Sequence, residues 1–299
     1  MAERSSVQDQ FYAGLSNIEL GEQRIEFPRG IVLEATFAHL MSPLVMAFMK
    51  PEREGQPHPG PWKSARGGFG QDISAQLFVP NEAGSSYGER LQLAATILFL
   101  IRLWSSPAVT MPAVANMAFN DVKHAPDAEA HILPLEHQPR HFELRPMDDT
   151  QVVASLTWVV DHFETAWRLR KESTEFRLAA DALDAGQFVQ NTALTFISLW
   201  GALEAIFSPS TTELRFRVSS LIASYLYPPG PQRRDEQKRI AALYDKRSAA
   251  AHGKPKHAGD DLLATFELLR KVLIRIIMHG KVPSREELDD CLFGARQGK

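Results

Sequence analysis

Two hydrophobic patterns divide the chain. In the N-terminal part, apolar and polar residues alternate, for example through 31–37 and 73–79, which is the period-two pattern of half-buried strands. Residues 89–103 are apolar on most faces and predict a helix, and short strands are expected at 108–117, 130–136 and 141–145. The segment 50–71 is rich in Gly, Pro and charge and predicts a long mobile loop.

The second part has helical periodicity throughout. Asp148 and Asp149 suit a helix N-terminus, and Ser210 with Glu213 forms a capping-box pattern ahead of another apolar stripe. The sequence PPGP interrupts the pattern at 228–231, and Gly253 stands where a helix would end. The helices expected are 148–171, 173–185, 186–207, a helix from the capping box to 225, 232–252 and 260–277.

Proline usage and charge change near the same position. Thirteen of the 19 prolines lie in 1–146, and none occurs in 147–208. Residues 1–146 carry 12 Lys and Arg against 16 Asp and Glu, whereas 147–299 carry 21 against 20. We therefore expect an α+β N-terminal domain over 1–146, followed by an all-α helical bundle over 147–299.

Several classes of protein are excluded by what the sequence lacks. The only cysteine, Cys291, rules out intrachain disulfides and cysteine-based metal centres and favours a reducing cytoplasm. The polar start predicts no signal peptide, and the charge-free stretch 186–203 is too polar for a membrane span. The motifs of zinc proteases, serine-hydrolase elbows and P-loop nucleotidases are missing. No cofactor and no membrane contact are expected.

Three histidines in the first part could in principle bind a metal ion. His131, His137 and His141 lie near Glu136, but Pro139 separates two of them. Histidines along a surface hairpin are more often unliganded, so no metal site is predicted. A metal-dependent hydrolase remains a third and weaker alternative.

One pair of residues, Arg247 and His252, has a context that suits catalysis. The spacing alone means little, because Arg53 and His58 repeat it in the predicted loop. Arg247 is in phase with an apolar helix face, and His252 lies in the last turn, where its imidazole could transfer a proton. Positions five apart point about 140° from each other on a helix. Either the helix unwinds at His252, or two copies of the motif meet across a dimer axis.

The surroundings of this pair are basic. Residues 233–257 hold eight Lys and Arg against three Asp and Glu, which suits a polyanion such as RNA. Glu204 lies on an otherwise apolar helix and needs a partner, for which Arg215, Arg217 and Arg247 are the candidates. The cations expected to contact RNA are Arg215, Arg217, Lys246, Lys254 and Lys256.

Three segments together resemble a known family. They read LWGALEAIF (199–207), ELRFRVSSLIASYL (213–226) and LYDKRSAAAHGKP (243–255), and in this order they are similar to the Apea-like HEPN domain of prokaryotic proteins. The resemblance covers about 188–293. It implies a bundle that dimerises, with Arg247 and His252 of both chains lining one cleft. It also implies metal-independent endoribonuclease activity, often as a toxin or antiviral effector.

The residue types fit that chemistry. His252 could take the proton of a ribose 2′-OH, Arg247 could neutralise the charge that develops on the phosphate, and Tyr244 and Ser248 could position it. Active members of the family usually carry Asn, Asp or His after the arginine, whereas this chain has Ser248, which implies slower cleavage or binding alone. The alternative is thus a dimeric RNA-binding or protein-interaction module without catalysis. The RNA target, any regulatory protein or phage-derived trigger, and the role of 1–146 are not specified by the sequence.

Overall fold

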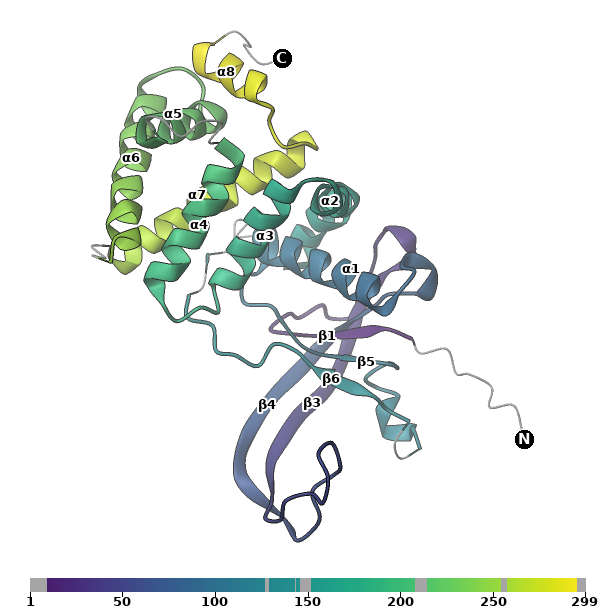
Figure 1. Ribbon diagram of the computed structural model, residues 1–299. Coiled ribbons are helices and arrows are strands. Elements are labelled where there is room, and N and C mark those ends of the chain that lie inside the picture. The colour runs from purple at the N-terminus through teal and green to yellow at the C-terminus, as the bar shows by residue number, and fades with distance from the viewer. Residues whose placement is uncertain are drawn as a thin grey trace. The chain divides into compact units, whose positions relative to one another are not determined.

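The computed structural model describes residues 10–126, 129–142, 144–145, 152–207, 214–253 and 257–294. The chain divides into two compact units, one within Met1–Ala94 and Val109–His137 and the other within Ala95–Ala108 and Gln138–Lys299. The first unit is built on an antiparallel sheet and the second is helical (Figure 1). The helical unit also includes 95–108 and 138–145, which precede the boundary expected at 146.

The first unit contains one sheet of antiparallel strands in the order β2-β3-β4-β1-β5-β6. Its core includes Ile73 and Phe119, and Gly14 of the central strand lies against both of them. A Cβ at Gly14 would come within 2.9 Å of each side chain, so a larger residue there would have to displace them. The strands are β1 (Tyr12–Ser16), β2 (Arg24–Glu26), β3 (Val32–Ala47), β4 (Trp62–Phe78), β5 (Thr110–Ala115) and β6 (Ile132–Pro134).

The segment 50–71 is only partly the loop that its composition predicted. β4 begins at Trp62 and pairs with β3 from Trp62 opposite Ala47 to Phe78 opposite Val32, with register shifts between Ala35 and Ala38 and between Ser42 and Leu44. Pairing with β3 on both sides of the glycine-rich stretch keeps it within the strand, so β3 and β4 form a long hairpin that extends past the other strands (Figure 1). The consecutive residues Leu44, Val45 and Met46 are all about half exposed. Because neighbours on a strand point to opposite faces, exposed apolar side chains lie on both faces of this arm.

The predicted strand at 141–145 is wrong for the residues described there. The His141 backbone N–H donates to the Gln187 carbonyl at 2.8 Å, and the Arg145 carbonyl accepts a hydrogen bond from Arg270. These backbone groups bond to helical elements and not to a neighbouring strand. The helix predicted at 89–103 is α1 (Tyr87–Leu100), followed by a π-helical turn over Ile101–Ser105.

The helices predicted in the second unit are present, with shifts at their ends. Ser173, at which the second of these helices is expected to begin, is the N-cap of α3, since its hydroxyl accepts from the Phe176 N–H at 3.1 Å. The expected starts at Asp148 and at Ser210 and Glu213 lie outside the described residues. The helices are α2 (Val152–Glu172), α3 (Thr174–Gly186), α4 (Thr192–Phe207), α5 (Leu214–Leu226), α6 (Pro231–Ala251), α7 (Gly259–His279) and α8 (Arg285–Phe293).

Two features of this unit correct the prediction. α4 begins at Thr192 and not at Gly186, because α3 continues through Gly186 and the Asn191 side chain then accepts from the N–H groups of Ala193 and Leu194 at 3.1 and 3.2 Å. α8 was not predicted, although Ser284 and Glu287 form its capping box. Among the residues that the structure describes, no helix is both long enough and apolar enough to cross a bilayer.

Candidate functional site

α6 carries most of the candidate site residues. Pro231 opens the helix, and Ile240, Leu243 and Tyr244 are buried along one side. The helix is regular through Ala251, and Gly253 then adopts φ +70°, a left-handed conformation in which its N–H donates to the Ala250 carbonyl at 3.1 Å. The helix end expected at Gly253 is therefore confirmed.

Glu204 of α4 joins two residues of α6. Its carboxylate accepts a hydrogen bond from Arg247 Nη2 at 3.0 Å and another from Tyr244 Oη at 2.9 Å. Tyr244 and Arg247 are three residues apart and lie on one helix face, so the two oxygens of one carboxylate serve both. Of the three arginines considered as partners for Glu204, the structure selects Arg247.

This cluster is partly withdrawn from solvent. The side chains of Arg247 and Glu204 are 25% and 20% exposed, and the Arg247 guanidinium lies 5.6 Å from the centre of the Tyr244 ring. Burial raises the pKa of Tyr244, and the hydrogen bond to Glu204 and its negative charge add to that shift. Tyr244 therefore stays protonated near neutral pH and acts as a hydrogen-bond donor.

Part of the Arg247 guanidinium has no partner. Its Nε is buried and makes no hydrogen bond within the described part of the chain. A buried N–H without an acceptor is unfavourable. Glu204 thus holds Arg247 in place through Nη2, while the Nε–H of Arg247 remains without an acceptor among the described residues.

His252 lies exposed at the end of α6. Its backbone N–H donates to the carbonyl of the partly exposed Ser248 at 3.2 Å, and its ring has no hydrogen-bond or ion-pair partner among the residues described. α6 is helical through Ala251, and His252 ends it with a φ of −95° and a ψ of 20°, outside the helical range. On a regular helix, side chains five positions apart point about 140° from each other. Among the described residues the Arg247 and His252 side chains of one chain make no contact with each other, and the meeting of two copies stays a prediction.

Two of the cations expected to contact RNA are engaged with carboxylates of the same chain. Arg215 forms two hydrogen bonds with Asp245, at 2.7 and 2.9 Å, and these bonds raise the pKa of Arg215. Lys246 contacts Asp261 at 2.5 Å. Arg217 is exposed and has no ion-pair partner in the described residues, and Lys254 and Lys256 lie outside them.

The contact with Lys246 also affects Asp261. Burial alone would raise the pKa of the Asp261 carboxyl, but hydrogen bonds from Lys246 and from the backbone N–H of Ala258 outweigh that effect. The pKa of Asp261 therefore lies below its ordinary value. Asp261 is ionised at neutral pH and fixes the first turn of α7.

His257 is a candidate site residue that the sequence did not indicate. Its ring stacks on Phe196 with centroids 4.9 Å apart, and its Nε2 hydrogen-bonds with Thr192 Oγ1 at 3.1 Å. Its Nδ1 is buried without a hydrogen-bond partner within the described residues. No spacing rule points to this histidine, because its neighbours come from α4, about sixty residues away in the sequence.

The other arginine and histidine with this spacing lie in a different setting. Arg53 and His58 are exposed in the turn between β3 and β4, as the sequence predicted. His58 Nδ1 donates to the carbonyl of Met49 at 2.9 Å. Neither residue is held by a helix, so the pair shares only its spacing with Arg247 and His252.

The described ranges of the chain contain no group of three or more His, Cys, Asp or Glu side chains arranged to hold a metal ion. Comparison with known proteins finds no matching family model, no similar curated protein and no similar solved structure.

Proposed function

We propose that the helical unit is a HEPN-type, metal-independent endoribonuclease that uses Arg247 and His252 in a cleft between two copies of the chain. The observation that carries the proposal is the fixed position of Arg247, which Glu204 holds by a 3.0 Å ion pair five residues before an exposed histidine at a helix end. A positioned cation and an accessible imidazole are the two groups that phosphodiester cleavage by the 2′-OH requires.

The steps of the reaction follow from these groups. A neutral His252 accepts the proton of the ribose 2′-OH, whose oxygen attacks the adjacent phosphorus. The bond from phosphorus to the 5′-oxygen breaks, and an imidazolium, supplied by the other copy of His252, protonates the leaving oxygen. Arg247 compensates the extra negative charge of the transition state. The products are a 2′,3′-cyclic phosphate and a 5′-hydroxyl, and the wider role would be that of a toxin or antiviral effector.

A second candidate function is favoured by the ion pair itself. Glu204 neutralises much of the Arg247 charge, and Ser248 replaces the residue that active members of the resembled family usually carry. A dimeric module that binds RNA or protein without cleaving it would need no more than this arrangement.

The two candidates are separated by incubating the purified full chain with single-stranded RNA in excess EDTA. The nuclease proposal expects cleavage with cyclic phosphate ends, while a matching DNA stays intact because it lacks the 2′-OH. RNA that the protein binds without cutting it supports the binding module. Cleavage that EDTA abolishes and magnesium restores contradicts the mechanism.

A further inference from the structure

The outer part of the β3–β4 arm is a ribbon of two strands that no other described strand joins. β2 pairs with β3 only at 32–34, and β1 pairs with β4 only at 75–78. Beyond these residues β3 and β4 pair only with each other, up to Ala47 and Trp62 (Figure 1). A two-stranded hairpin on its own is marginally stable in water, so the arm stands to gain stability from a partner.

This outer part carries a concentration of exposed apolar side chains. Six of them, each about half exposed or more, form what we call the apolar belt: Leu44, Val45, Met46, Phe48, Met49 and Trp62. Phe37 and Met41, which are 68% and 65% exposed, extend the belt toward the rest of the sheet. Eight such side chains present about 800 Å² of apolar surface, which is the area that each partner contributes to a standard interface.

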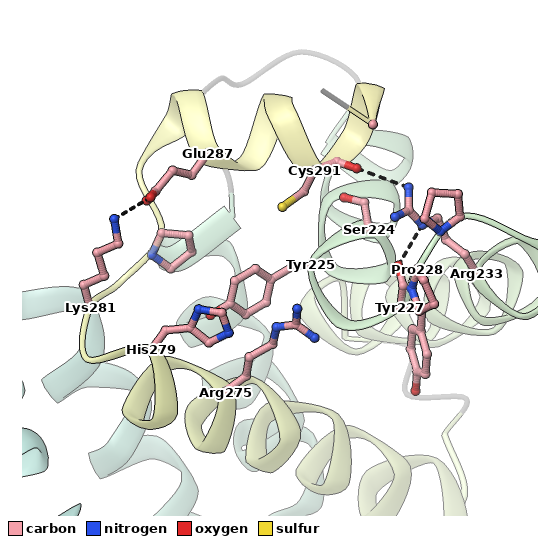
Figure 2. Close-up of a pocket in the computed structure, with 13 residues that line it drawn as sticks. Ser224, Tyr225, Tyr227, Pro228, Arg233, Arg275, His279, Lys281, Glu287 and Cys291 are labelled. Carbon is pink, nitrogen blue, oxygen red and sulfur yellow. Dashed lines mark hydrogen bonds and ion pairs between the residues drawn. The ribbon is translucent and has the colours of Figure 1, made fainter. Parts of the chain in front are cut away.

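The helical unit differs from the arm. Its exposed large apolar side chains come one from each of five helices, namely Leu178, Leu194, Phe216, Met278 and Phe293. Its hollow of about 710 Å³ lies beside Arg275, between the end of α5, the start of α6, the end of α7 and α8 (Figure 2), with Lys281 and Glu287 paired at its edge. Two concave surfaces do not fit each other, so the hollow is no site for a symmetric contact.

Hydrogen bonds hold the belt in position. His58 Nδ1 donates to the Met49 carbonyl at 2.9 Å, and Trp62 Nε1 donates to the His58 carbonyl at 2.9 Å. Nearer the rest of the sheet, His39 Nδ1 and Asp72 Oδ1 are hydrogen-bonded across the two strands at 2.7 Å. A surface that is already ordered loses less conformational entropy when it binds a partner.

The charges of the arm select the kind of partner. Residues 50–60 form the turn beyond the belt, and they include Lys50, Glu52, Arg53 and Glu54 but no apolar side chain larger than proline. A bilayer could reach the belt only if this charged turn entered it first, which is unfavourable. Over 36–74 the arm holds four Lys and Arg against three Asp and Glu. It is therefore nearly neutral, so it neither favours a polyanion nor repels a copy of itself.

We propose that the arm binds the arm of a second copy of this chain, with the two belts packed against each other across a two-fold axis. Such a contact requires one surface that fits itself, and an exposed, apolar and nearly neutral belt meets this requirement. If the helical units form a dimer, the arms join one dimer to the next, and otherwise they join two chains. The proposal therefore rests neither on the nuclease activity nor on the helical dimer.

Sedimentation velocity of the full chain tests the contact, with the protein itself as the probe. Interfaces of standard area bind in the micromolar range or tighter, so at about 200 µM the wild type should have at least about twice the weight-average mass of a variant without the contact. Val45→Glu with Phe48→Glu is that variant, because it places like charges on both sides of the axis. Equal masses of the wild type and this variant at every concentration would leave the belt to another occupant and overturn the proposal.

Further variants separate the contact from folding. Val45 and Phe48 are more than half exposed, so their replacement should leave the thermal midpoint unchanged. If the midpoint falls by several degrees, Leu44→Ser with Met46→Ser takes its place and should weaken the association about tenfold or more, because it removes apolar area without adding charge. Leu178→Glu, on the exposed side of α3, is the matched control and should associate like the wild type. Association that survives both belt variants contradicts the proposed location.

A mixture of opposite charges tests whether the belt meets its own copy. Val45→Lys with Phe48→Lys should fail to associate alone, as the glutamate variant does. An equimolar mixture of the two variants should regain the higher mass, because opposite charges then face each other. A mixture that keeps the mass of the separate variants shows that the belt meets a different surface and overturns the two-fold contact.

Discussion

Arg247 of α6 and Glu204 of α4, 43 residues apart in sequence, form a partly buried ion pair that also receives the hydroxyl of Tyr244. The pair fixes the arginine and at the same time reduces its charge. Whether the arginine acts on a phosphate therefore depends on how a bound RNA competes with Glu204.

We expect Glu204→Ala to destabilise the helical unit by about 2 kcal/mol, because it leaves two partly buried donors without an acceptor. This corresponds to a fall in the thermal midpoint of about 4–8 °C for a unit of this size. Thermal unfolding followed by circular dichroism measures it. Glu172→Ala is the control, because Glu172 pairs with Arg168 across one turn of α2, where the two side chains are 63% and 48% exposed, and such surface pairs contribute about 0.5 kcal/mol or less. Equal effects of both substitutions would show that the cluster is not structural.

Arg247→Ala and His252→Ala should each abolish RNA cleavage while leaving the fold nearly intact. Loss of a proton-transfer group lowers a rate by about 10²–10⁴, and loss of a charge that stabilises the transition state lowers it by about 10²–10³. Initial rates on a fluorescent RNA measure the effect. Because Arg247 is paired with Glu204, its removal should also cost some stability, whereas the exposed His252 should cost almost none.

Arg53→Ala and His58→Ala are the matched controls, with the same spacing in the β3–β4 turn, and should leave the rate unchanged. The binding module predicts a different pattern, in which Arg247→Ala weakens RNA affinity and His252→Ala has little effect at neutral pH. If none of the four substitutions changes cleavage or binding, both proposed functions fail.

The sequence predicts helices well where apolar residues recur on one face and a cap follows. Ser173 and Gly253 mark helix ends that the structure confirms. The start of α4 was misplaced because the uncharged run 186–203 continues the apolar pattern across a real break, which only the capping role of Asn191 reveals. The capping pattern of Ser284 and Glu287 was also present in the sequence, ahead of α8.

Features that depend on contacts between residues far apart in the sequence could not be predicted from local sequence patterns. The stretch that begins at Trp62 has the composition of a loop, and only its pairing with β3 makes it a strand. The partner of Glu204 could be narrowed to three arginines, but selecting Arg247 required the packing of α4 against α6. The stacking of His257 on Phe196 and the hollow beside Arg275 have no local signature at all.

Acid should destabilise the helical unit partly through Asp261. The pKa of this carboxyl is lower in the folded protein than its ordinary value of 3.8, so its contribution is complete above that value and is lost as the pH falls through the folded pKa. Asp261→Asn should therefore lose less stability than the wild type between neutral pH and the acid range. Urea unfolding at a series of pH values measures the difference, and parallel pH profiles would contradict the assignment.

The apolar arm formed by β3 and β4 should contribute to association and not to folding. Leu44 and Met46 are 54% and 49% exposed and, two residues apart, lie on one face of the strand. Contiguous exposed apolar surface of this kind promotes contacts with other molecules. Leu44→Ser with Met46→Ser should lower the binding of a hydrophobic dye and leave the thermal midpoint unchanged. A fall of several degrees would show that these side chains are packed within the fold.

The last prediction concerns the assembly that the nuclease proposal requires. We expect a homodimer through the helical unit, which light scattering detects, and the arm variant should remain dimeric. When Arg247→Ala and His252→Ala chains are mixed with subunit exchange, half of the dimers are hybrids that hold one Arg247 and one His252 on different chains. If Arg247 of one chain works with His252 of the other, every hybrid keeps one such pair but lacks the second His252 that protonates the leaving oxygen. The mixture should then be more active than either variant alone and stay well below a quarter of the wild-type activity. If one chain supplies both residues, no mixture of these inactive variants regains activity. In light scattering, loss of the dimer in the Leu44→Ser and Met46→Ser variant would place the dimer contact in the first unit.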